Sequence, residues 1–165
     1  LADNFAGMRF GGTASDNAFE DYEEGTWTPV LGGTGSDPTM SYDHQIGWYV
    51  KIGNIVHFGG RLEWNSSGSS GGSGDATIKT LPFASGGDSN LFTGVGFVKL
   101  NFRGFDGNFS SGRDYIDLMI KRPEARLLIM QLDYDNPDGG NYTNASLSQC
   151  IAGNAHLDFS GAYTI

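Results

Sequence analysis

Oxygen-bearing side chains are densest in one turn-rich stretch of the chain, Asp133-Tyr-Asp-Asn-Pro-Asp-Gly-Gly-Asn141. Tyrosine rings can stack on the flat faces of pyranose sugars, while carboxylates and amides can hydrogen-bond sugar hydroxyls. Shallow polar sites of this kind are common on loops that a rigid scaffold holds in place. The stretch therefore gives a first set of candidate sugar-binding residues, namely Tyr134, Asp135, Asn136, Asp138 and Tyr142.

The same loop could in principle surround a calcium ion, because spaced carboxylates on a glycine-containing turn are typical calcium ligands. The EF-hand spacing fails, however, since Pro137 occupies a ligand position and no bidentate glutamate follows in register. We expect a solvated turn instead, opened by Asn-Pro and Asp-Gly. The three histidines also lack a metal-ligand spacing, although a trimer axis could gather three copies of one histidine. We therefore expect no cofactor and assign no metal ligand.

A second, weaker candidate lies in the glycine-rich connection at 101–113. Its candidate ligand-binding residues are Arg103, Phe105 and Asp106. Phe105 and Phe109 stand where apolar rings are expected to be hidden. They either bury against a neighbouring chain, which we favour, or are offered to a ligand.

Catalysis is not expected from the sequence. No G-x-S-x-G nucleophile motif is present, and no phosphate-binding loop motif occurs. Carboxylates are plentiful, but a glycosidase needs two of them facing each other across a sugar, at about 5 to 9.5 Å. Sequence cannot show such a pair, so a polysaccharide depolymerase remains an alternative.

Composition indicates a single all-β domain. The 165 residues include 26 glycines, and 13% of the chain is aromatic, which fits short strands separated by turns. The net charge of −9 argues against nucleic acid and against anionic membrane surfaces as partners. No apolar run approaches the roughly 20 residues that span a bilayer. Cys150, the only cysteine, is expected to be a buried apolar residue.

Apolar and polar residues alternate most clearly at 55–64, where the even positions carry the apolar Val56, Phe58, Leu62 and Trp64. This period of two predicts a half-buried strand. Further strands are expected at 26–31, 48–52, 75–81, 92–102, 115–121, 126–134 and 156–164. The result is an antiparallel, jelly-roll-like β-sandwich of about eight strands.

The connections between these strands are expected to differ in kind. Residues 122–125 should form a turn, although Pro123-Glu124 could instead open a helix. Residues 144–152 are the best helix candidate, and the Ser/Gly-rich stretch at 66–74 is expected to be a flexible loop. We predict one core, made of Val56, Phe58, Leu62, Trp64, Ile78, Val98, Leu100, Ile116, Leu118, Ile129 and Phe159.

Five segments of the chain resemble the C-terminal receptor-binding domains of bacteriophage tail fibres. An acidic DYEEGTWTP segment at 21–29 is followed by a Y-x-K-I-G-N-x-V hairpin at 49–56. A Gly/Ser-rich loop at 66–74, LPF at 81–83 and FSGAY at 159–163 complete the likeness, and the centre of the chain, about 85–150, carries no such motif.

The resemblance implies a homotrimer at the tip of a fibre, which attaches the virion to a bacterial surface glycan, a lipopolysaccharide or an outer-membrane protein. Residues 1–18 would be the arm from the fibre shaft, and 19–165 the receptor-binding domain. Val95 and Phe97 lie on the same side of the predicted 92–102 strand as the polar Lys99 and Asn101. Part of that strand is therefore apolar on both faces, so we expect the strand and the arm to form the subunit contact. A structural module that only caps or trimerises the fibre is the main alternative. The chain lacks an initial methionine and is expected to be part of a longer fibre protein.

Overall fold

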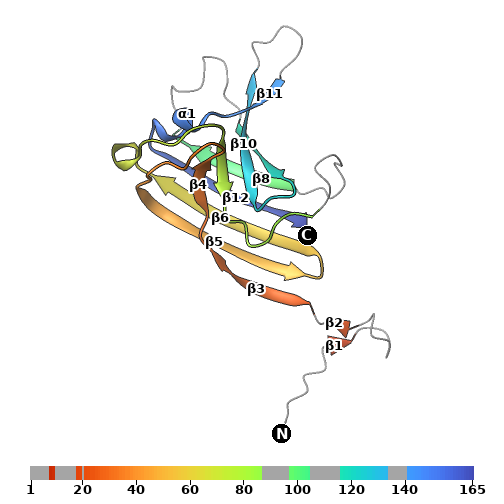
Figure 1. The fold of residues 1–165 in the computed structure, drawn as a ribbon. Coiled ribbons are helices and arrows are strands. Elements are labelled where there is room, and N and C mark those ends of the chain that lie inside the picture. The colour runs from red at the N-terminus through yellow and green to blue at the C-terminus, as the bar shows by residue number, and fades with distance from the viewer. Residues whose placement is uncertain (1–7, 10–17, 20, 87–96, 105–115, 134–140) are drawn as a thin grey trace.

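The computed structural model describes residues 8–9, 18–19, 21–86, 97–104, 116–133 and 141–165 (Figure 1). Within them the molecule consists of two five-stranded antiparallel sheets and a short two-stranded ribbon. The ribbon pairs β1 (Met8–Arg9) with β2 (Ala18–Phe19) and lies beyond the far end of β3 in Figure 1. No helix among the described residues is long and apolar enough to cross a membrane.

The first sheet has the order β3-β5-β6-β12-β8. Its centre is the hairpin of β5 and β6, which turns at Gly53 and Asn54, and β12 pairs along the full length of β6. Gly53 has a φ of 58°, a left-handed conformation that glycine adopts without strain. The strands are β3 (Tyr22–Trp27), β5 (Tyr42–Ile52), β6 (Ile55–Trp64), β8 (Phe97–Arg103) and β12 (Ala155–Thr164).

The second sheet is built around β10, which pairs with β9 along one edge. Its other edge pairs first with β7 and then with β11, and β4 pairs with β7. The strands are β4 (Val30–Gly33), β7 (Ala76–Lys79), β9 (Ile116–Lys121), β10 (Arg126–Asp133) and β11 (Asn141–Asn144). Residues 122–125 form the turn between β9 and β10, so the helix considered there does not exist.

In the described part of the chain, two short helices interrupt the strands. The 3-10 helix η2 spans Ser66–Gly68, and α1 spans Leu147–Ile151. The predicted helix at 144–152 is thus confirmed in a shorter form. It begins after Ser146, whose side-chain hydroxyl accepts a hydrogen bond from the Gln149 backbone N–H, while the Gln149 side-chain oxygen accepts one from the Ser146 backbone N–H. This capping box satisfies backbone donors that the first helical turn leaves unpaired.

The predicted antiparallel β-sandwich is confirmed, with differences in detail. The described residues form two five-stranded sheets instead of the two Greek keys of an eight-stranded jelly roll. Sequence patterns missed β11, and they merged β3 with β4. They also began β5 at Trp48, although it starts at Tyr42, because His44, Gln45 and Ile46 break the expected alternation of apolar and polar residues.

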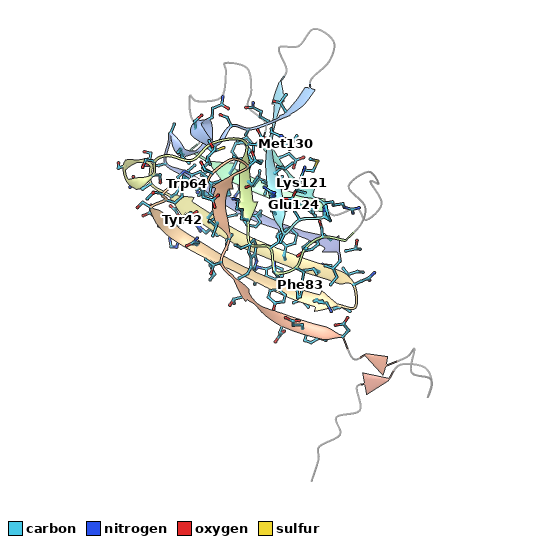
Figure 2. The ribbon with its side chains drawn as sticks, in the orientation of Figure 1. Tyr42, Trp64, Phe83, Lys121, Glu124 and Met130 are labelled. Carbon is cyan, nitrogen blue, oxygen red and sulfur yellow. The ribbon has the colours of Figure 1, made fainter. Side chains whose placement is uncertain are left out.

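The core lies between the two sheets and contains every residue predicted for it. Val98 and Leu100 are half-buried against it, while the other nine are buried. Phe58 is at its centre, with edge-to-face contacts to the Trp27 and Tyr163 rings. Trp64, labelled in Figure 2 near its β5 partner Tyr42, is 1% exposed. The alternation along β6 therefore predicted the correct register.

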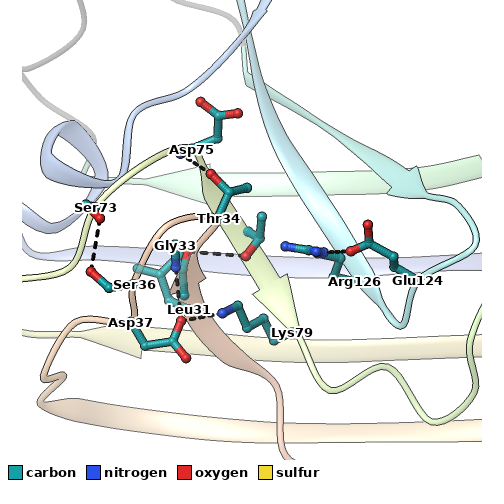
Figure 3. Close-up of polar contacts among 12 residues, drawn as sticks. Leu31, Gly33, Thr34, Ser36, Asp37, Ser73, Asp75, Lys79, Glu124 and Arg126 are labelled. Atoms are coloured by element: carbon teal, nitrogen blue, oxygen red, sulfur yellow. Dashed lines mark hydrogen bonds and ion pairs between the residues drawn. The ribbon is translucent and has the colours of Figure 1, made fainter.

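The Ser/Gly-rich stretch at 66–74 is not the free loop that its composition predicted. It runs antiparallel to residues 34–41, with backbone hydrogen bonds that join Thr39 to Ser70 and Ser36 to Ser73. The Ser36 and Ser73 hydroxyls lie 3.0 Å apart, and the Thr34 hydroxyl accepts from the Asp75 backbone (Figure 3). Small side chains let the two segments approach closely, and this pairing holds the stretch in place.

Cys150 is buried, as predicted, and has no disulfide partner. Desolvation in the core raises the pKa of its thiol to about 12, because burial disfavours the charged thiolate. The same cause raises the pKa of Tyr163 to about 12. The Tyr163 hydroxyl donates to the Phe83 carbonyl at 2.8 Å, which ties the segment after β7 to the core.

A candidate binding groove across the first sheet

The outer face of the first sheet carries the molecule's most distinctive arrangement of exposed side chains. Register places Trp48 of β5, Gly59 of β6, Ser160 of β12 and Lys99 of β8 in one row across four strands. The next row is Ile46, Arg61, Asp158 and Asn101. Successive residues of a strand point to opposite faces, so these eight residues share the face opposite the core.

Trp48 lies down on the sheet because its neighbour has no side chain. A Cβ built on Gly59 would come within 2.7 Å of the Trp48 indole nitrogen, which is closer than real Cβ atoms approach. The indole therefore occupies the space above Gly59 while remaining 50% exposed. Ile46, two residues earlier on the same face, is 61% exposed. Together they form an apolar wall that water reaches freely.

The backbone beneath this wall is held from the core side. The Trp27 indole N–H lies 3.3 Å from the Trp48 carbonyl oxygen and 3.2 Å from the Gly59 carbonyl oxygen, and donates to both. It reaches them because Gly47 leaves room, since a Cβ there would fall 2.3 Å from the Trp27 nitrogen. One buried tryptophan thus holds the two strands that carry the exposed one.

A groove runs across the strands at this place, with a volume of about 510 Å³. We call it the cross-strand groove. Its apolar wall is Ile46 and Trp48, and Lys99 and Asn101 line the opposite side, three strands away. Gly47, Gly60 and Phe159 also line it. The remaining lining residues are Thr26, Arg61, Asp158 and Ser160. Its volume lies within the range of small-ligand sites, about 300 to 1,000 Å³.

A chain of charged groups borders one side of the groove. The Arg61 guanidinium lies 3.0 Å from a Glu63 carboxylate oxygen and 3.7 Å from an Asp158 carboxylate oxygen. His44 approaches Glu63 at 3.7 Å, and His156 approaches Asp158 at 3.6 Å. These charges largely compensate one another. Lys99, on the far wall, is exposed and has no ion-pair partner among the described residues.

Most predicted receptor-binding residues cannot be placed against this groove. Tyr134, Asp135, Asn136, Asp138, Phe105 and Asp106 lie outside the described residues. The backbone of Tyr142 lies in β11 of the second sheet, opposite Leu132, and its side chain is likewise outside the description. Only Arg103 is placed. It ends β8, is exposed, and shares the outer face of the first sheet with Lys99 and Asn101.

Sequence reasoning missed the groove itself. Trp48 directly precedes the 49–56 family motif and was assigned to a strand, and the outward side of β6 could be read from the sequence as Ile55, His57, Gly59, Arg61 and Glu63. Pairing across four strands was not visible, so no pattern joined Trp48 to Lys99. The described residues contain no group of three or more His, Cys, Asp or Glu side chains arranged to hold a metal ion.

The fold and the groove define a two-sheet antiparallel β domain with a concave outer face, and comparison with known proteins adds one likeness. No family model matches the sequence, and no curated protein matches it either. Among solved structures, the crystal structure of the Dettilon tailspike protein (gp208) matches with a TM-score of 0.59 and 20% identity. The match covers 87% of this chain but only 24% of the tailspike chain. At this identity the likeness shows a shared fold.

Proposed function

We propose that this chain is a module of a phage tail fibre or tailspike that attaches the virion to a bacterial surface structure. The observation that carries the proposal is the fold, which matches part of a tailspike protein over most of this chain. The tail-fibre resemblance of residues 21–29 and 49–56 supports the same conclusion from sequence alone. In this role the chain acts outside the cell, as part of the virion, and its receptor is a surface glycan or lipopolysaccharide.

The proposed activity is binding and not cleavage. The groove's carboxylate, Asp158, is close to Arg61 and His156, and the nearby Glu63 is close to Arg61 and His44. A glycosidase instead uses two carboxyl groups that face each other across the sugar, about 5 to 9.5 Å apart. Among the described residues that line the groove, Asp158 is the only carboxylate, so the groove offers a place to bind a sugar without the pair that cleavage needs.

We place the module in a homotrimer, as tail-fibre resemblance implies. Exposed large apolar side chains gather at one end of the first sheet, where Tyr22, Ile52 and Ile55 occupy one row across β3, β5 and β6. Ile165 is also exposed, and its backbone donates to the Asn54 carbonyl in the same hairpin turn. We call these four residues the end patch. Contiguous exposed apolar surface is typical of protein contacts, so the end patch is our proposed subunit contact.

The contact expected on the 92–102 strand receives less support. Its described outward residues, Lys99 and Asn101, are polar and exposed, while Val98, Leu100 and Phe102 are half-buried against the core. Val95 and the Phe97 side chain, on which that expectation depended, are outside the description. The end patch is therefore the better place to test assembly.

In the proposed mechanism, stable attachment depends on many binding sites acting together. Three weak sites on one fibre, and several fibres on one particle, raise avidity by about two to four orders of magnitude over a single site. Each individual contact stays weak enough to release. A particle could then sample a bacterial surface before attachment becomes stable.

The test is attachment of the fluorescently labelled 165-residue chain to candidate host cells, together with its mass by light scattering. We expect a trimer that stains host cells, and we expect Ile52→Glu to reduce assembly because a buried unpaired charge is costly at a contact. Lys121→Glu, on the second sheet, is the matched control.

Three results would contradict parts of this proposal. A mass of one chain at micromolar concentration would refute the trimer. A trimer that stains no host would favour the purely structural fibre-capping module. Release of reducing ends from purified host polysaccharide would instead identify a depolymerase.

A further inference from the structure

We infer that the cross-strand groove binds a saccharide bearing an anionic group, a pyranose with a carboxylate or phosphate. This inference rests on the proposed attachment function and specifies the class of ligand that its groove takes. It draws on three features of the groove: an aromatic wall, a cation opposite it with no ion-pair partner among the described residues, and the separation between them.

The aromatic wall suits the flat apolar face of a sugar ring. Trp48 is half exposed although a core lies directly beneath its strand, and the indole is held down over Gly59. Tryptophan has an extended apolar ring and little conformational freedom to lose, which makes it a frequent anchor at binding surfaces. Ile46 widens the same wall. A planar ligand can therefore cover Trp48 without rearrangement of the sheet.

The opposite wall supplies charge and hydrogen bonds. Lys99 and Asn101 alternate on the outward face of β8, and both line the groove. The charge of Arg61 is already compensated by Glu63 and Asp158, whereas Lys99 has no such partner in the described part of the chain. An ammonium group without a counter-ion gains most from a carboxylate or phosphate, because charge-assisted hydrogen bonds are the stronger ones.

The separation of the walls matches a substituted sugar. Trp48 and Lys99 stand in the same row, three strands apart, and each strand spacing is about 4.8 Å, so their backbones are about 14 Å apart. The Trp48 indole lies over Gly59, and Lys99 lines the groove beside its small β12 neighbour Ser160. A ring against Trp48 can thus direct an acidic substituent toward Lys99, with Asn101, Ser160 and Asp158 available to its hydroxyls.

The net charge of the chain opposes general binding of acidic sugars, so a preference for them must come from one specific site. At −9 the protein repels polyanions at long range, so an acidic glycan would not adsorb indiscriminately to its surface. Binding that favours an acidic sugar must then come from a specific cation. Lys99 is the groove residue placed to provide it.

The experiment measures binding of the full chain to immobilised oligogalacturonate and to phosphomannan oligosaccharides. Each probe is paired with its neutral counterpart, methyl-esterified or dephosphorylated, and the two probe types separate a carboxylate source from a phosphate source. The variants are Trp48→Ala and Lys99→Met. Met119→Ala, exposed on β9, and Lys121→Met are the matched controls on the second sheet.

We expect the parent chain to favour an acidic probe over its neutral counterpart by about tenfold, the value of one charge-assisted contact. Trp48→Ala should weaken binding to both members of that pair by about tenfold or more. Lys99→Met should remove only the preference for the acidic member. The two control variants should bind as the parent does.

The inference is overturned if no acidic probe binds the parent chain, or if both groove variants bind as the parent does. Cell attachment, measured in parallel, keeps the two proposals separate. Host staining by the parent chain without any binding of acidic probes refutes the groove inference and leaves the attachment function standing. Binding of acidic probes without any host staining supports the groove and refutes the attachment function.

Discussion

The two faces of the first sheet are made by the same strands, yet they differ in almost every physical respect. The inner face of β6 presents Val56, Phe58 and Leu62, all at 0% exposure, to the second sheet. The outer face presents exposed Trp48, Arg61 and Lys99 to solvent. Among the described residues, the second sheet packs on the inner face, and no element packs on the outer face. The difference indicates that one face holds the fold together while the other is available for recognition.

Removing an aromatic ring from the inner face should have the largest effect on stability. It would directly test whether the inner face holds the fold together and the outer face does not. Phe58→Ala is expected to lower the free energy of unfolding by about 3 to 5 kcal/mol, because the cavity lies at the centre of a packed aromatic cluster. Trp48→Ala removes a larger ring from the outer face and should lower it by less than about 1.5 kcal/mol, since that ring is half exposed. Urea denaturation measures both. Equal losses would mean that the outer face also supports the fold.

Substitutions at two glycines, one on each face of the first sheet, test the same comparison with a smaller change in side-chain size. Gly47→Ala should destabilise by about 1 to 3 kcal/mol, because its new Cβ would collide with the buried Trp27 indole and disturb its two hydrogen bonds. Gly59→Ala meets the half-exposed Trp48, which can rotate away, so the loss should stay below about 1 kcal/mol.

Indole N–H resonances would distinguish the two glycine variants. Gly47→Ala should move the Trp27 signal and Gly59→Ala chiefly the Trp48 signal. Gly59→Ala should also impair the groove, because Trp48 could no longer lie on the sheet. A larger loss of stability for Gly59→Ala than for Gly47→Ala would contradict this account.

The smallest effect is expected from the charged border of the groove. Arg61→Gln removes contacts with Glu63 and Asp158, but exposed ion pairs contribute only about 0 to 1 kcal/mol each. Thermal unfolding in low and high salt should therefore differ little between the variant and the parent. A loss comparable to that of Phe58→Ala would show that the outer charges hold the strands together.

Sequence alone determined the class of fold and most of the core. Alternation along 55–64 identified the buried side of β6, because a period of two leaves only one apolar face. The burial of Cys150 and the capped helix that contains it were likewise predictable from local chemistry. The composition of residues 66–74 led to the wrong prediction of a flexible loop. Composition indicates how freely an isolated segment moves, but it does not reveal a neighbouring segment that pairs with it.

Only the tertiary structure decided where the cross-strand groove lies. Trp48, Arg61, Asp158 and Lys99 come from four strands, and the separation between the first and the last of them in the chain is more than a hundred residues. Hydrogen-bonded register brings them into adjacent rows, and Gly59 lets the indole lie flat enough to form a wall. Local patterns reveal which side of one strand faces water, but the neighbours on that side depend on strand order, which long-range pairing sets.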